Sequence, residues 1–430
     1  MASAGSTGWW PAPFVAAAVV VLAALFIWQR GSYVDYAEGV YLSSARLTLH
    51  GAVPYRDFVA AHPPLLFYTG AGLLAIWDSL DGVRVLLSLV TMATGGLVAV
   101  AVMRLTGSGT AAAIAGVLAI VAPWSLHEHA TLMPETFAAP LLMASALLAS
   151  RRSTAPVAGL IAAVAVGFKW PYLLAGLALA LTAAAPRRYL AFLLAGFATG
   201  VLASFALFGA GDLYRQLVVA QEQLGWHTVR YDAGLAAQAT WNVAPLLILA
   251  AFGVRFAARS RDPALLRSIV ALALATIVLV ATIAKTGTYL NTIVPVEPPL
   301  VALATAGTVW LFGSPRARGS RRRARMVVCA AWILSATQVI SFVARPTHPG
   351  LFVRPLSAPA HAWIGKAQVA ASVRQARACP PGAAYSGAPF VAFVARRRLP
   401  ANEPDQFLMT TPAGARAAAA AARDSIRCPG

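Results

Sequence analysis

The stretch VDYAEGVYLSSARLTLHGAVPYRDFVAAHPPLL, residues 34–66, follows the first apolar segment of the chain and leads into the second. It gathers charge in a chain that otherwise avoids it, and it places two acids, Asp35 and Glu38, three residues apart. Residues at this spacing share one face of a helix. The stretch therefore predicts either a reactive pair of carboxylates at a membrane surface or, more simply, two acids of a solvated loop.

The composition of the whole chain indicates an integral membrane protein. Of its 430 residues, 59% are hydrophobic and only 11% are charged, whereas a soluble domain carries about 25% charged residues. The apolar runs suit helical spans of about 20 residues and are too long for barrel strands of about 9–11. Lipid offers the backbone no hydrogen-bond partner, so each run is expected to be a helix. The twelve apolar segments are 12–28, 64–78, 84–104, 109–123, 134–150, 155–168, 171–184, 189–208, 241–258, 266–284, 289–312 and 326–343.

The net charge of +19 predicts an orientation in the membrane and not binding to nucleic acid, because the basic residues form short clusters between apolar segments. Such clusters can also attract anionic membrane lipids or a lipid-linked phosphate. The clusters expected in the cytoplasm are Arg151-Arg152, Arg187-Arg188, 255–267 and 316–325. Alternation then places the loops 124–133 and 209–240 and the tail 344–430 on the outer side.

The number of crossings is open in the first half of the chain. Twelve full crossings put both termini on one side, whereas an outer tail together with an outer 29–63 loop needs an odd number. Either the short segment 64–78 does not cross, or the segment 84–104, which contains two adjacent glycines, is split. We predict an all-α polytopic bundle of about 11–13 transmembrane helices over residues 1–343, with the first segment retained as a span.

The tail, residues 344–430, is predicted to be a small extracytoplasmic α+β appendage. The sequence AAYSGAPFVAFVARRRLPANEPDQF, residues 383–407, favours a short strand and turns. Residues 411–426 are rich in alanine, the best helix former, and favour a helix. Cys379 and Cys428 can form a disulfide in an oxidising compartment, whereas Cys329 lies within an apolar segment and is expected to be inert.

After its two acids, the opening stretch continues with an amphipathic run over 40–49, which predicts a helix lying along the membrane interface. The whole order of motifs resembles the GT-C superfamily of polyprenyl-phosphate-sugar-dependent glycosyltransferases. Its protein O-mannosyltransferase branch (glycosyltransferase family 39) and its aminoarabinose-transferase branch are the most similar. The matching residues are Asp35, Glu38-Gly39, Gly51, Pro54-Tyr55, Asp57 and His62-Pro63-Pro64.

One departure from the family pattern concerns the catalytic acid. The family often has Asp-Glu-Gly in direct succession, whereas here Ala37 precedes Glu38 and the aspartate, Asp35, comes earlier. The resemblance therefore leaves open whether Asp35 or Glu38 is the catalytic acid. We favour Asp35 because it is nearer the end of the first helix.

A second match lies in HEHATLMPETFAAPLL, residues 127–142, where Pro134-Glu135 resembles the second acid that the family carries at the start of a helix. The resemblance implies that Glu135 is a further catalytic residue. Two acids from separate loops can bracket an acceptor hydroxyl or hold a divalent metal ion, Mg²⁺ or Mn²⁺. The ligands of such an ion would be Asp35, Glu135 and His129. A solvated loop at the mouth of the helix is the alternative.

Several polar residues near helix ends are expected to bind the substrate. A lysine at membrane depth costs about 3 kcal/mol unless it reaches the interface, and the family often has Lys-x-Pro where this chain has Lys169-Trp170-Pro171. The resemblance implies contact between Lys169 and the donor phosphate. The residues expected to bind substrate are Tyr55, Arg56, Asp57, His62, Lys169, Arg230, Lys285, Tyr289 and Asn291.

The function that the resemblance implies is inverting transfer of a sugar at the extracytoplasmic face of the inner or plasma membrane. The donor would be a polyprenyl-phosphate sugar, the acceptor an envelope glycan, lipid or protein, and Asp35 the general base. No Walker loop or Gly-rich dinucleotide turn is present, so no nucleotide cofactor is expected. A transporter or flippase of lipid-linked sugars and a non-catalytic membrane scaffold are the alternatives.

Overall fold

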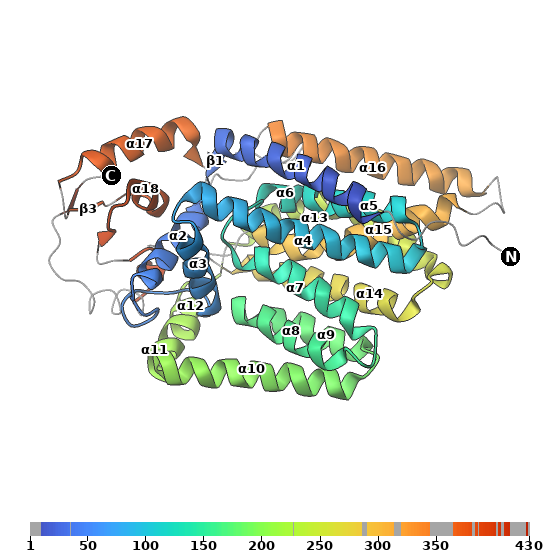
Figure 1. The fold of residues 1–430 in the computed structure, drawn as a ribbon, viewed down its shortest axis with the longest axis horizontal. Helices are drawn as coiled ribbons and strands as arrows, with labels where there is room; N and C mark the ends of the chain where they lie inside the picture. Colours follow the sequence, from blue (N-terminus) through green and yellow to red (C-terminus); the bar gives the residue numbers. More distant parts are fainter. Residues whose placement is uncertain are drawn as a thin grey trace.

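The fold is a bundle of long apolar helices with a smaller C-terminal part at one end (Figure 1). The computed structural model describes residues 10–34, 36–226, 228–285, 290–313, 320–344, 364–380, 383–385, 387–400, 403–405, 408–412 and 427–428. In this part of the chain, seven helices are long and apolar enough to cross a membrane, and five shorter apolar helices accompany them. Together these twelve helices coincide with the twelve predicted segments, which confirms the polytopic helical class.

The bounds of these helices follow from local signals such as a proline in the first turn of α10 and α14, where the missing N–H costs nothing. The long helices are α1 (Pro11–Ser32), α4 (Leu80–Thr106), α10 (Pro186–Phe208), α13 (Val229–Arg255), α14 (Pro263–Leu279), α15 (Glu297–Phe312) and α16 (Ser320–Ala344). The shorter ones are α3 (Leu65–Ile76), α5 (Gly109–Val121), α7 (Pro134–Ala149), α8 (Ala155–Phe168) and α9 (Tyr172–Thr182). Turns of 3-10 helix, Val280–Ala284 and Leu290–Val296, follow α14 and precede α15.

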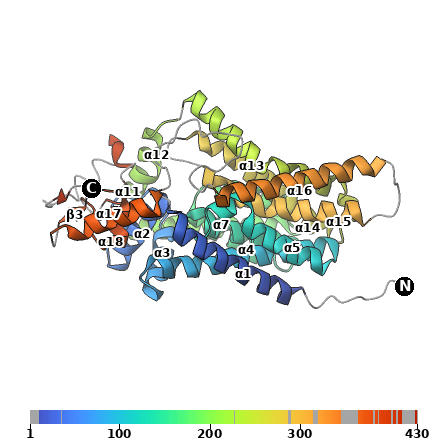
Figure 2. The same ribbon diagram turned by 90° about the horizontal axis from the view of Figure 1, so that it is seen from above.

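The segment that breaks the regular alternation is α3. It has only 12 residues, about 18 Å of helix, against a hydrocarbon core of about 30 Å. Figures 1 and 2 show it beside α2 (Tyr36–Leu49), at the end of the bundle where the C-terminal elements also lie. By contrast α4 is one unbroken helix of 27 residues, so the alternative of a split 84–104 segment is wrong. The position of α3, and not its length, sets it apart, because α9 has only 11 residues. The pairing of β1 (Tyr33–Val34) with β2 (Ile364–Gly365) puts the first loop, residues 29–63, and the described part of the tail at one end. Leaving α3 out of the twelve would give eleven crossings, the odd number that this arrangement needs.

At the opposite end of the bundle, the segment 255–267, which the sequence assigns to the cytoplasm, meets the ends of α4 and α7. Arg104, at the end of α4, pairs with Asp262 at 2.5 Å and donates to the Ser150 hydroxyl at 2.8 Å. The backbone N–H of Arg261 bonds to the Leu105 carbonyl at 3.0 Å. Asp262 also caps α14 by accepting from the Leu265 N–H. The basic loops thus meet each other at one end, away from the first loop and the tail.

The segment 209–240 differs from the long polar loop that the sequence predicts. It forms α11 (Ala210–Tyr214), a π-helical turn (Arg215–Val219) and α12 (Ala220–Gln223) before α13 begins. Its Leu213 and Leu217 pack into the same hydrophobic cluster as Tyr55 and Phe58 of the first loop. Burial of this apolar face stabilises these short helices, although the polar composition of the segment predicts a loop.

The C-terminal part, here called the cap, comprises the described residues from Ile364 onward. It contains β2 (Ile364–Gly365), α17 (Lys366–Ala378), β3 (Ala384–Tyr385), α18 (Pro389–Ala395), a 3-10 turn (Leu408–Thr410) and β4 (Arg427–Cys428). The predicted strand is present, but residues 389–395 are helical where turns are expected, because Pro389 opens a helix with a buried apolar face. Cys379 is disulfide-bonded and Cys329 is free. The helix predicted over 411–426 lies almost wholly outside the described residues.

Candidate functional site

Helix α2 carries the first loop away from α1 and is buried under the cap. It ends before Gly51, whose φ of +90° suits glycine, as the sequence predicts. Its Val40, Leu42 and Ala45 are buried, so the helix does not lie on the lipid interface as the sequence suggests. The reason is close packing of α18: a Cβ at Gly39 would lie 2.4 Å from the Phe390 nitrogen. The glycine after Glu38 is therefore needed for this contact.

Glu38 forms a buried ion pair with Arg84 of α4. The Arg84 Nη2 lies 2.6 Å from Oε2 of Glu38 and Nε lies 3.1 Å from Oε1, and both side chains are at most 2% exposed. Such a two-point contact fixes the orientation of both groups. Asp35, the other candidate acid, lies outside the described residues. Arg84 was missed in the sequence, although an arginine within an apolar segment is itself a signal of a buried partner.

Glu135 and Lys169, singled out separately in the sequence, are ion-pair partners. Glu135 is in the first turn of α7 and fully buried, and Lys169 follows the last residue of α8. Lys169 Nζ lies 2.6 Å from Glu135 Oε1. The second carboxylate oxygen, Oε2, is buried and has no hydrogen-bond partner among the described residues. Lys169 is therefore held by a buried acid and does not simply extend toward the membrane surface.

His62 of the first loop lies close enough to Lys169 to experience its charge. Its Nε2 lies 2.6 Å from the Tyr41 hydroxyl, and its carbonyl accepts a hydrogen bond from the Tyr55 hydroxyl at 2.5 Å. Burial, followed by the positive charge of nearby Lys169, lowers the pKa of His62 to about 3. The imidazole is therefore neutral at pH 7. Three segments that are far apart in the sequence thus bring His62, Glu135 and Lys169 together.

The low pKa of His62 makes stability depend on pH. Below its usual pKa of 6.5 the unfolded chain binds a proton that the folded protein does not. We therefore expect the contribution of His62 to the free energy of unfolding to fall as the pH drops from 6.5 toward 3, by about 2 kcal/mol at pH 5. Other buried titratable groups also make stability depend on pH, so the contribution is measured by comparing thermal unfolding of wild type and His62→Gln in detergent at pH 7 and at pH 5; the change between the two pH values should be shifted in the variant by this amount. An equal loss in the variant would contradict the assignment.

The turn before His62 has its own internal supports. Tyr55 is buried and has a φ of +69°, which non-glycine residues seldom adopt. Asp57 Oδ2 accepts a hydrogen bond from the Val53 N–H at 2.7 Å. The hydrogen bonds from Arg56 and from Val53 lower the pKa of Asp57. Arg56 and Asp57 thus form the turn at the surface, while the Tyr55 hydroxyl reaches inward to His62.

The remaining predicted binding residues lie on neighbouring segments. Lys285 Nζ lies 5.5 Å from the centre of the exposed Trp226 ring, a cation–π contact. Asn291 Nδ2 lies 3.8 Å from Sδ of Met133, the residue directly before α7. The buried Oδ1 of Asn291 has no hydrogen-bond partner among the described residues. Tyr289 and the side chain of Arg230 lie outside the described residues.

The described residues do not favour a divalent metal. No three His, Cys, Asp or Glu side chains in the described part of the chain come together as a metal site would need. Glu135 already forms an ion pair with Lys169. His129 is hydrogen-bonded to the Ser88 hydroxyl at 3.3 Å and lies within the electrostatic influence of Arg84. A cation beside each ligand opposes binding of a second cation. The metal remains a prediction that involves Asp35.

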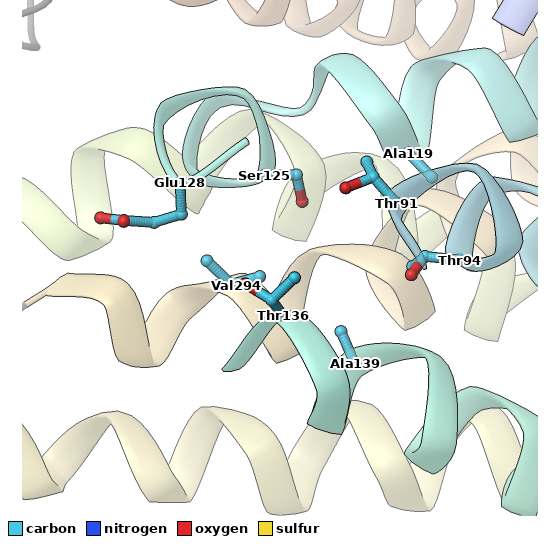
Figure 3. A pocket seen from close by; sticks show the side chains of 8 residues that line it. All are labelled: Thr91, Thr94, Ala119, Ser125, Glu128, Thr136, Ala139 and Val294. Atoms are coloured by element: carbon cyan, nitrogen blue, oxygen red, sulfur yellow. The ribbon is translucent and has the colours of Figure 1, made fainter. Parts of the chain in front are cut away.

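A small polar cavity lies deeper in the bundle (Figure 3). Its volume is about 20 Å³, enough for about one water molecule and too small for a sugar. The side chains come from α4, α5, α6 (Pro123–His127), the residue directly after α6, α7 and the 3-10 turn before α15. They are Thr91, Thr94, Ala119, Ser125, Glu128, Thr136, Ala139 and Val294.

Comparison with known proteins identifies the fold. No protein-family model matches the sequence, and no curated protein matches it. Among solved structures, ArnT from Cupriavidus metallidurans bound to undecaprenyl phosphate is similar with a TM-score of 0.63 and 16% identity, over 93% of this chain and 88% of that chain. Its apo structure is similar with a TM-score of 0.62 and 16% identity, over 91% and 85%. The chain therefore has the polytopic membrane GT-C fold that ArnT also has.

Proposed function

We propose that this protein is a membrane glycosyltransferase that transfers a sugar from a polyprenyl-phosphate donor to an acceptor at the cap end of the bundle. The observation that carries the proposal is the ion pair between buried Glu135 and partly buried Lys169, whose charge also acts on His62. The fold shared with ArnT, whose structure binds undecaprenyl phosphate, supports a lipid-linked donor. The arginine clusters at the opposite end support an extracytoplasmic site in the inner or plasma membrane.

In the proposed reaction the acceptor hydroxyl or amine attacks the anomeric carbon of the donor. A bond from the acceptor atom to this carbon forms, the bond to the phosphate oxygen breaks, and the phosphate leaves with the electron pair. Asp35 takes the acceptor proton. Attack opposite the leaving group inverts the anomeric centre. Lys169 stabilises the charge that grows on the phosphate, and Glu135 orients the lysine through their ion pair.

The test is sugar transfer in proteoliposomes that contain a radiolabelled undecaprenyl-phosphate sugar and cell-envelope acceptors. The double variant Lys169→Met with Glu135→Gln removes the pair without leaving a lone buried charge. Its transfer rate is expected to fall about 10²–10³-fold, because a phosphate ligand in a dry site contributes that much.

Lys169→Arg is the matched control, because it keeps the positive charge and should retain much more transfer than the double variant. Equal rates in wild type and the double variant would contradict the role of Lys169. Movement of the donor across the bilayer without any transfer by wild type would instead identify a flippase.

A further inference from the structure

The cap holds the first loop at several points. β2 of the cap pairs antiparallel with β1 (Tyr33–Val34), directly before Asp35. The Ser43 hydroxyl donates to the Pro389 carbonyl at 3.1 Å. Arg46 donates to the Phe393 carbonyl at 2.6 Å, and its guanidinium lies 3.7 Å from the centre of the Phe393 ring. The cap is thus joined to both the start and the middle of the loop.

Glu403 extends this contact to the far side of the loop. Its carboxylate oxygen Oε2 accepts a hydrogen bond from the Val59 N–H at 2.7 Å. Glu403 is 1% exposed, and its Oε1 has no partner among the described residues. Val59 and Leu408 also share a small apolar cluster with Ala220. The cap therefore contacts the loop just before His62 through both a buried carboxyl group and apolar packing.

Gln216 binds the backbone of the same segment at two other residues. Its Oε1 accepts from the Ala60 N–H at 3.0 Å, and its Nε2 donates to the Tyr55 carbonyl at 2.6 Å. Gln216 is buried on the π-helical turn after α11, a kind of turn that often occurs at functional sites. Buried backbone groups need partners, and here side chains from two distant segments supply them. Residues 55–60 are therefore shaped by Gln216 and Glu403 together.

We propose that Glu403 is a positioning residue of the cap that, with Gln216, fixes the 55–62 segment and so places His62 beside the Glu135–Lys169 pair. The segment ends at His62, which is hydrogen-bonded to Tyr41 and close to Lys169. A shift of the backbone at Val59 is carried to His62 through the two residues between them, Ala60 and Ala61. The cap then completes the site without contacting substrate. Only the expected effect of Glu403 on sugar transfer rests on the proposed function; its effect on the 55–62 segment does not.

The carboxyl group of Glu403 acts mainly as a neutral hydrogen-bonding group. Burial, together with the nearby charge of Asp405, raises the pKa of Glu403 to about 8, although the Val59 hydrogen bond opposes the shift. Glutamine has the same shape and keeps an oxygen that can accept from Val59. Glu403→Gln is therefore expected to preserve the contact, whereas Glu403→Ala removes it.

The experiment is hydrogen–deuterium exchange of the full-length protein in proteoliposomes, read at peptides covering residues 55–62. Glu403→Ala is expected to raise the exchange rate of the Val59 and Ala60 amides about tenfold or more, as loss of a buried hydrogen-bond partner does. Glu403→Gln should restore the wild-type rate. Asp81→Asn, a matched carboxyl-to-amide change in the first turn of α4, where Asp81 pairs with the exposed Arg30, should leave the rate unchanged. In the transfer assay, Glu403→Ala should lower kcat more than it changes KM.

Gln216→Glu provides a second test if Glu403→Ala does not fold. It places a carboxylate oxygen against the Tyr55 carbonyl and should raise exchange in the same peptide. The proposal is overturned if exchange at 55–62 is unchanged in both variants, or if Asp81→Asn raises it as much as Glu403→Ala. Absence of transfer by wild type would contradict the proposed function alone, because exchange needs no turnover.

Discussion

Asp35→Asn is expected to lower sugar transfer about 10²–10⁴-fold, the usual contribution of a general base. Asparagine has nearly the shape of aspartate, but its amide cannot take the proton of the acceptor. Folding should be preserved, because the change removes a charge and no bulk. Initial rates of transfer from a radiolabelled undecaprenyl-phosphate sugar, together with the melting temperature in detergent, measure both effects.

Asp78→Asn is the control for a lost carboxylate at the same end of the bundle. Asp78 pairs with Arg46 and Arg396 at a partly exposed position, where ion pairs contribute little. Its transfer rate should stay within a few-fold of wild type. Full activity of Asp35→Asn in folded protein would refute the proposed base and with it the mechanism.

Arg84→Met is expected to destabilise the protein by about 3–5 kcal/mol, the largest stability effect that we predict. The substitution removes the ion-pair partner of Glu38, which lies 46 residues away in the sequence, and leaves the Glu38 carboxylate buried. The expected readout is a lower free energy of unfolding in a denaturant titration in detergent. The effect should be lost in large part when Glu38→Gln is added, because the buried charge is then gone.

This double-mutant cycle also separates the two candidate acids. A strongly non-additive cycle confirms the coupling of Glu38 and Arg84, whereas additive effects would contradict it. If Glu38 serves the fold, the double variant should transfer sugar at a rate within about tenfold of wild type, which corresponds to an activation barrier raised by less than about 1.4 kcal/mol. Loss of transfer in a stable double variant would move the role of base from Asp35 to Glu38.

Much of the architecture was predictable because membrane insertion depends on local composition. A run of apolar residues must become a helix in lipid wherever its neighbours lie, and all twelve predicted segments are helical. Segments that are polar by composition were harder. The helices of 210–223 form because Leu213 and Leu217 pack on the first loop, and that contact is invisible in the segment itself.

The candidate site shows the same division. Residue type and motif position singled out His62, Glu135 and Lys169 one by one, because a charge or a histidine near lipid needs a reason to be there. Their meeting was not predictable, since Glu135 and Lys169 are 34 residues apart on different helices. Glu403 carried no signal in the sequence at all. It lies 344 residues from Val59 in the sequence and accepts a hydrogen bond from the Val59 N–H.

The sequence by itself thus determined that the protein is a helical membrane bundle, which segments form its apolar helices, and which residue types are costly at their positions. Only the tertiary structure decided that α3 stands outside the count of crossings and that Arg84 engages Glu38. It also decided that Glu403 of the cap accepts a hydrogen bond from the first loop shortly before His62. Hydrophobic burial acts on each segment separately and can be read along the chain. A buried hydrogen bond or ion pair depends on the positions of two distant segments at once.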